Sequence, residues 1–176
     1  MPTLMALAGW EDAIRASLSG ATGTIEEKDA QVRRSGLYAE YPAVLRCYID
    51  LFAVGSERPE ALKRAVFLVW LSTAEPAPFT GVAELPEGYA REVMSALEAD
   101  ARGGRLDDEF RAMLAWYHSI LPLSFEIYGA NRHAPEIARE VAPDAWRREF
   151  TAAQFAHRGQ LGEYWRSVLG SAAAGR

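Results

Sequence analysis

The chain has 176 residues, of which 49% are hydrophobic and 24% are charged, and its formal net charge at pH 7 is −5. This length is typical of one globular domain, and the composition indicates neither wholesale disorder nor a membrane protein. The acidic balance argues against a nucleic-acid-binding protein, because such proteins usually carry a basic patch.

Cys47 is the only cysteine, which excludes an intrachain disulfide and a CxxC redox or zinc motif. The N-terminal segment lacks a basic stretch, and Glu11 and Asp12 interrupt its apolar run, so no signal peptide is predicted. These features favour a cytoplasmic protein. Only Lys28 and Lys63 among the 19 basic residues are lysine, a bias that suggests a GC-rich bacterial source.

The first 40 residues predict two helices. Thr3 to Leu18 carries apolar residues near helical spacing, and Gly20 is placed to end it. Thr24 and Glu27 have the spacing of a capping box, in which two side chains bond the free amides at a helix start. The polar helix that follows, from about residue 25 to residue 34, has almost no apolar stripe, so it is expected on the surface.

A helical hairpin is predicted next, and its second helix is expected at the centre of the fold. Pro42 begins a helix that runs to about Val54, and Pro59 begins the next helix after a very short turn. Residues 65–71 are seven apolar residues in a row. They leave no polar face, so this segment should be buried all round, and it is too short to cross a bilayer.

A second hairpin follows a loop that Pro76, Pro78 and Gly81 impose. One helix runs from Pro86 to about residue 103, and Asp107 opens a partner helix with the clearest amphipathic stripe in the chain. A second long loop runs from Pro122 to His133. Within it, residues 123–128 alternate with a period of two, a pattern that an extended segment would show.

In the C-terminal part, Pro135 and Pro143 are placed as helix starts, and Gly159 separates two amphipathic pieces. The expected organisation is one all-α domain. Residues 1–40 form N-terminal helices that pack on the core, residues 41–134 form a central pair of α-hairpins, residues 135–170 form C-terminal helices, and residues 171–176 form a frayed tail.

One internal regularity bears on the architecture. At an offset of 46 residues, Leu68 and Trp70 superpose on Leu114 and Trp116, and Pro76 superposes on Pro122. A period near this value resembles that of HEAT and armadillo units, in which helical pairs stack. The alternative is a closed helical bundle with a chance match. In both architectures, the two long loops should emerge at the same end of the molecule.

That shared end gives the candidate binding site, because long ordered loops in compact domains often carry function. The predicted site residues are Glu75, Thr80, Glu126, Tyr128, Asn131, Arg132 and His133, with Glu84 and Ser124 beside them. The alternative interpretation is that these side chains cap neighbouring backbone or are simply solvated.

Other chemically capable residues have structural interpretations that we prefer. The three histidines, His118, His133 and His157, lack metal-ligand spacing, so no metal is predicted, and a carbonyl-bonded core-edge role is expected for His118. Cys47 is expected to pack in the core. Trp116 projects away from its helix stripe, so it is expected to meet a neighbouring helix.

The chain contains no Walker loop, GxGxxG or EF-hand motif, and no cofactor is predicted. The favoured function is a cytoplasmic protein-binding or scaffold protein, for example an inhibitor or immunity-type protein whose acidic surface binds a basic partner. The alternative is a small helical enzyme or small-molecule-binding protein that uses the loop edge around Glu75, Glu126 and His133. Self-association through an apolar helix face is a third hypothesis, and neither nucleic acid nor membrane is an expected partner.

Overall fold

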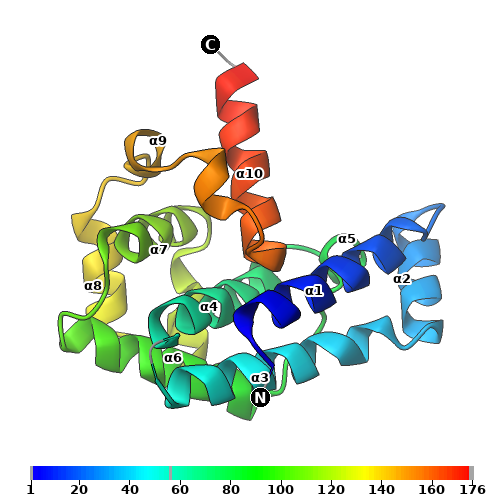
Figure 1. Ribbon diagram of the computed structural model, residues 1–176, viewed down its shortest axis with the longest axis horizontal. Coiled ribbons are helices and arrows are strands. Elements are labelled where there is room, and N and C mark those ends of the chain that lie inside the picture. Colours follow the sequence, from blue (N-terminus) through cyan, green and yellow to red (C-terminus); the bar gives the residue numbers. More distant parts are fainter. Residues whose placement is uncertain (1, 56, 175–176) are drawn as a thin grey trace.

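The computed structural model describes residues 2–55 and 57–174, and within these ranges the chain is helical and contains no strand (Figure 1). The predicted all-α single domain is therefore confirmed. The elements in chain order are α1 (Leu4–Ser19), α2 (Ile25–Arg34), η1 (Leu37–Ala39), α3 (Glu40–Ala53), α4 (Arg58–Ala74), α5 (Ala77–Thr80), α6 (Glu87–Arg102), α7 (Asp108–Ile120), η2 (Pro122–Ser124), η3 (Glu126–Tyr128), α8 (His133–Glu140), α9 (Trp146–Glu149), η4 (Ala152–Phe155) and α10 (Gly159–Ala174), where η marks a 3₁₀ helix.

Helix α4 is enclosed by its neighbours, as the run of apolar residues predicts. Every residue from Ala61 to Leu71 is buried, and α4 packs on α3, α6, α7 and α10. It forms the expected antiparallel hairpin with α3 (Figure 1). The buried stretch also includes Lys63 and Arg64, whose charges must be compensated inside the fold because a buried unpaired charge is costly.

The two N-terminal helices begin and end as their sequences predict. The Thr3 side chain accepts a hydrogen bond at the start of α1, and Gly20 caps its end. At the start of α2, the Thr24 and Glu27 side chains form the complete capping box. Val32 is the one residue of α2 that is buried, so α2 lies on the surface.

The second helical pair differs from the first in its packing. Helices α6 and α7 are joined by a short turn, and the Asp107 side chain caps α7 by accepting from the Phe110 amide at 2.8 Å. However, α6 packs chiefly on α4 and α8, and α7 packs chiefly on α8. The pair is therefore more open than the hairpin of α3 and α4.

Residues 46 positions apart lie at corresponding places in their helices, but their surroundings in the fold differ. Phe79 is 56% exposed, whereas Phe125 at the corresponding position is fully buried. Trp70 stacks on Tyr117 with ring centroids 4.5 Å apart, whereas Trp116 is half-buried and packs edge-on against Trp146. The packing of the first pair is thus not repeated in the second.

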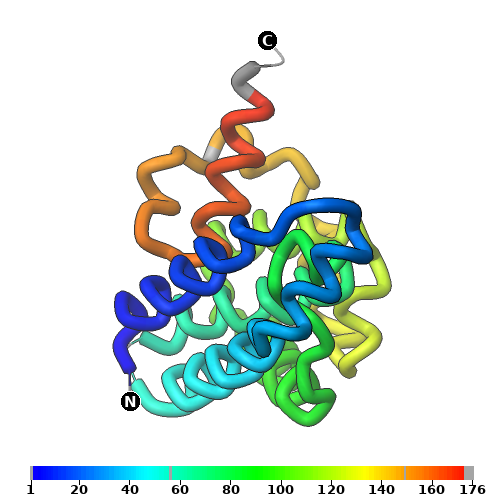
Figure 2. Tube along the Cα trace, turned by 90° about the vertical axis from the view of Figure 1, so that its right-hand side faces the viewer, coloured from blue at the N-terminus to red at the C-terminus, as the bar shows by residue number. Residues whose placement is uncertain are grey.

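The N-terminal and C-terminal helices meet, which corresponds to the closed-bundle alternative. Helix α10 packs on α1, η4 and α4, and Figure 2 shows its last turns extending beyond the rest of the domain. Two tryptophan-to-tyrosine hydrogen bonds join α7 to α10: Trp116 donates to Tyr164 at 2.8 Å, and Trp165 donates to Tyr117 at 3.1 Å. The expectation that Trp116 meets a neighbouring helix is confirmed.

Several local expectations are wrong. Residues 123–128 lie in the 3₁₀ turns η2 and η3, because Pro122 favours a helical turn where the alternation suggested an extended segment. Pro143 is followed by the single turn of α9, so no amphipathic helix begins there. Residues 171–174 of the predicted tail belong to α10, which runs to Ala174, and the fraying of this end stays a prediction. Residues 175 and 176 lie outside the described residues.

Candidate functional site

The first long loop folds around the short helix α5, which packs on α1 and α2 (Figure 1). Glu75 is the exposed C-terminal cap residue of α4. The Thr80 side chain is buried and accepts a hydrogen bond from the Val82 amide at 3.1 Å, so it stabilises the turn that leaves α5. Glu84 is exposed further along the loop. Of these three residues, Thr80 has a local structural role, as the alternative interpretation expects.

The second long loop is anchored by Glu98 of α6, a residue that was not among the predicted site residues. Its Oε1 accepts from the His133 amide at 2.8 Å and lies 2.7 Å from His133 Nδ1, and its Oε2 accepts from the Ala134 amide at 3.1 Å. Burial opposes ionisation, but these hydrogen bonds outweigh it and lower the pKa of Glu98. Glu98 thus caps the N-terminus of α8.

The remaining predicted residues of this loop do not converge on His133. Glu126, Asn131 and Arg132 are exposed, and Tyr128 is half-buried against the core. Glu98 could orient His133 as the carboxylate of a catalytic triad orients its histidine. Among the described residues, however, no hydroxyl or thiol forms a hydrogen bond with the His133 ring, so the pair lacks a nucleophile.

The two loops follow helices that run in the same direction. Lys63 near the start of α4 pairs with Asp107 at the start of α7, and Trp70 of α4 stacks on Tyr117 late in α7. The loops therefore leave the core at the same end. Within the described part of the chain, no hydrogen bond or ion pair joins the predicted residues of one loop to those of the other.

A cleft of about 490 Å³ opens between the first loop and the α2–η1 region, and we call it the α2 cleft. Its volume lies within the usual range for binding sites. One group of lining residues comes from α2 and η1, and the other comes from α4 and the first loop. They are Arg33, Tyr38, Ala39, Ser72, Ala77, Val82, Ala83 and Glu84.

Large aliphatic side chains are exposed at the end of α7 and on the second loop. Ile120, Leu123 and Ile127 are 45%, 60% and 49% exposed, respectively. They lie at the end of α7, in η2 and in η3, three elements that pack against one another in sequence. We call these three residues the aliphatic patch. Isolated exposed apolar residues are ordinary, whereas large contiguous apolar patches are typical of interaction surfaces.

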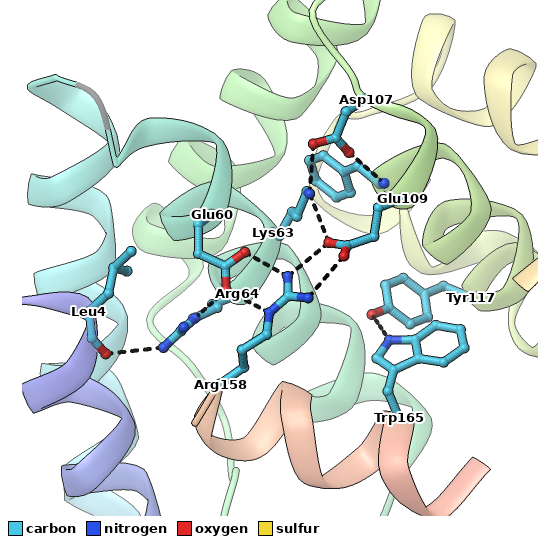
Figure 3. Close-up of polar contacts among 10 residues, drawn as sticks. Leu4, Glu60, Lys63, Arg64, Asp107, Glu109, Tyr117, Arg158 and Trp165 are labelled. Carbon is cyan, nitrogen blue, oxygen red and sulfur yellow. Dashed lines mark hydrogen bonds and ion pairs between the residues drawn. The ribbon is translucent and has the colours of Figure 1, made fainter. Parts of the chain in front are cut away.

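A network of charged side chains, in which Lys63, Arg64 and Arg158 are buried, joins α4, α7 and the turn before α10 (Figure 3). Lys63 Nζ lies 2.7 Å from Asp107 and 2.8 Å from Glu109. Arg158 bridges Glu109 at 2.9 Å and Glu60 at 2.6 Å.

The network continues through Arg64, which contacts Glu60 at 2.7 Å and donates to the Leu4 carbonyl at 3.1 Å (Figure 3). The turn that presents Arg158 has unusual backbone, because the φ angles of His157 and Gly159 are 61° and 58°. Non-glycine residues seldom adopt this left-handed conformation.

The charges of this network compensate one another. Burial disfavours ionisation of Glu109, but the hydrogen bonds from Arg158 and Lys63 outweigh it and lower the pKa of this carboxyl. Burial likewise opposes the charge of Arg158, but the two carboxylates raise the pKa of its guanidinium. Three basic and three acidic side chains are mutually engaged, so the arrangement serves the fold. The signal in the sequence was that Lys63 and Arg64 directly precede the apolar run of residues 65–71, in a helix expected at the centre of the fold.

Glu11 of α1 is a second buried charge that the sequence analysis did not identify. It is 1% exposed, and its Oε2 accepts from the Gln160 amide at 2.8 Å. Burial is the main cause that raises its pKa from 4.5 to about 7, against the opposing effects of the Gln160 amide and Arg64. Glu11 therefore ties α1 to the start of α10.

The other candidates have core positions. The His118 ring stacks on Phe125, and its buried Nδ1 has no hydrogen-bond partner among the described residues, so the expected bond to a carbonyl is wrong for this nitrogen. Cys47 is half-buried against the core. In the described ranges, no three His, Cys, Asp or Glu side chains are grouped as metal ligands. No described helix has both the length and the apolar character of a membrane span.

Comparison of the chain with protein-family models, with curated proteins and with solved structures gives no match.

Proposed function

We propose that this protein binds a partner protein through the aliphatic patch. The observation that carries the proposal is the exposure of Ile120, Leu123 and Ile127 on three consecutive elements, which are the last turn of α7 and the η2 and η3 turns of the second loop. Burial of such side chains is the main favourable term in protein association, and each contributes roughly 1.5–3 kcal/mol when it leaves water completely. The patch belongs to the second of the two loops that the sequence analysis selected as the binding edge.

A basic partner fits the charge of the chain. The net charge is −5, and Glu126, which lies between Leu123 and Ile127 in the sequence, is exposed. Opposite net charges accelerate the encounter of two proteins. The proposed role is thus that of a cytoplasmic binding or scaffold protein, such as an inhibitor or immunity-type protein that holds a basic protein.

The test begins with a photoreactive amino acid in place of Leu123 in cells that make the protein. One basic protein should be crosslinked reproducibly. The same residue in place of Val54, which is also 60% exposed but lies at the end of α3, should not capture it. The affinity of the purified pair is then measured for Leu123→Asp and for Val54→Asp.

We expect Leu123→Asp to weaken binding by roughly tenfold, since the 60% of the leucine that is exposed contributes about 1–2 kcal/mol when it is buried. Val54→Asp should leave the affinity unchanged. Both positions are exposed, so circular dichroism should show two folded variants. Equal affinities for all three proteins would refute the proposal. A dimer in light scattering that Leu123→Asp dissociates would also refute it, because the patch would then bind a second copy of the chain.

A further inference from the structure

Helices α7, α9 and α10 surround a second cleft, which differs from the α2 cleft in its aromatic lining. Helix α9 packs on α7, and the centroids of the Trp146 ring of α9 and the Trp165 ring of α10 are 5.9 Å apart (Figure 1). The cleft has a volume of about 350 Å³, within the range of small-molecule sites. Trp116, Trp146, Arg147 and one face of α10 line it, and we call it the tryptophan cleft.

The two tryptophans give this cleft a fixed aromatic surface. Trp146 is 1% exposed, and the half-buried Trp116 ring meets it edge-on with centroids 5.4 Å apart. The Trp116 ring is also held by the hydrogen bond that its Nε1 donates to Tyr164. Val168 and Ala172, which are neighbours on one face of α10, add apolar lining. A planar ring suits such a surface, because aromatic rings attract one another beyond the effect of burial.

The charge of the tryptophan cleft is positive. Among the described residues that line it, Arg147 is the only charged one. Its guanidinium lies 4.8 Å from the centre of the Trp146 ring, and among the described side chains no carboxylate lies within ion-pair distance of it. A planar guanidinium binds a carboxylate through two parallel hydrogen bonds. A carboxylate is therefore the complement that this cleft lacks.

Two serine hydroxyls are available on the α10 side of the tryptophan cleft. Ser167 and Ser171 are exposed, and they lie one turn apart on the same face of the helix. The hydroxyls of Ser72 and Ser119 donate to carbonyls of their own helices, at 2.8 Å and 2.7 Å. Within the described part of the chain, those of Ser167 and Ser171 form no such bond, so they can bond a polar group of a ligand.

We propose that the tryptophan cleft binds a small aromatic carboxylate, which is a planar ring system that carries one carboxyl group. The ring packs against Trp116 and the apolar residues of α10, and the carboxylate pairs with Arg147. A system of one or two fused rings suits the volume of about 350 Å³. The cleft shares no residue with the aliphatic patch, so this ligand and the proposed protein partner occupy different places on the molecule.

The experiment titrates the ¹⁵N-labelled protein with 2-naphthoate. We expect saturable changes of chemical shift that are centred on the indole N–H signals of Trp116 and Trp146 and on the Val168 amide. Naphthalene-2-carboxamide has the same shape without the charge, and it should bind more weakly by about fivefold or more. Acetate has the charge without the ring, and it should cause no saturable change. The two comparisons separate the contribution of the carboxylate from that of the ring.

Two neighbouring arginines identify the cation. Arg147→Gln should weaken 2-naphthoate binding by about fivefold, as expected for loss of one exposed ion pair, and should leave binding of the carboxamide unchanged. Arg148→Gln removes the next charge of α9, which is exposed but does not line the cleft, and should leave both affinities unchanged. Both positions are exposed, so circular dichroism should show two folded variants.

A third variant locates the ring. Ala172→Leu places a larger side chain in the tryptophan cleft, so it should weaken binding of both naphthyl compounds, whereas Leu123→Asp in the aliphatic patch should weaken neither. The inference would be overturned by the absence of saturable changes at millimolar 2-naphthoate or by changes centred outside the cleft. Equal affinities for the acid and the amide, or equal effects of the two arginine variants, would overturn it as well.

Discussion

Replacement of Glu11 by glutamine should remove a pH dependence that the fold imposes on this chain. The carboxyl is buried, and its pKa rises from 4.5 to about 7 on folding, chiefly because burial disfavours the charged form. Folding therefore favours the protonated carboxyl. Between pH 4.5 and pH 7 the native state holds a proton that the unfolded chain releases, so this group's contribution to stability falls as the pH rises.

The magnitude follows from the difference between the two pKa values. Between the two pKa values the free energy of unfolding falls by about 1.4 kcal/mol for each unit of pH. The total loss from this group is therefore about 3 kcal/mol by pH 8. Glutamine keeps an oxygen that accepts from the Gln160 amide and carries no charge. The variant and the natural chain should thus be equally stable near pH 4, and the variant should be more stable by about 3 kcal/mol at pH 8.

The assay is urea denaturation followed by tryptophan fluorescence, repeated from pH 4 to pH 8.5 for both chains. The difference between them isolates Glu11, because the other titrating groups are shared. Ser17→Ala is the matched control, since Ser17 is an exposed uncharged residue of the same helix and its replacement should give a difference that does not vary with pH. A Glu11→Gln variant that is less stable than the natural chain at pH 8 would refute the reasoning.

Three further substitutions test the fold. Arg158→Met should destabilise by about 1–3 kcal/mol in urea denaturation, because Glu60 and Glu109 lose the guanidinium that joins them although each keeps one other basic partner; a loss below about 0.5 kcal/mol would contradict that role. Gly159→Ala should destabilise by about 1–3 kcal/mol, because the φ of Gly159 is 58° and an added Cβ would lie 1.8 Å from a Glu11 oxygen. Gly170 lies in open space on α10, so Gly170→Ala should raise the melting temperature. Thr24→Ala should speed amide exchange in α2 by loss of a cap that contributes about 1 kcal/mol, and Thr22→Ala should not.

The sequence predicts the helices well because local rules decide them. The capping residues of α1, α2 and α7 are recognisable from a few neighbouring positions, and the enclosure of α4 follows from an apolar run with no polar face. Errors arise where tertiary packing decides. Residues 123–128 have a strand-like alternation but form 3₁₀ turns, and Trp70 and Trp116 occupy different environments although they are 46 residues apart in matching positions.

The candidate site was predictable only in part. The common direction of α4 and α7 places both long loops at one end, as expected, but the α2 cleft pairs the first loop with α2 instead of with the second loop. The contact of Glu98 with His133 is not predicted by the sequence, because Glu98 lies in the middle of a helix and 35 residues from His133. The aliphatic patch was also missed, since the pattern of a loop does not tell which apolar residues turn outward.

The positions of Glu11 and Arg158 also determine when the protein can finish folding. Glu11 bonds a residue 149 positions later, and Arg158 completes the environment of a glutamate 98 positions earlier. Contacts so distant in the chain form late and slow the folding of a domain. A nascent chain on the ribosome must therefore hold α4 with incompletely matched charges until the segment around residue 160 emerges, and only then can the whole domain become resistant to proteases.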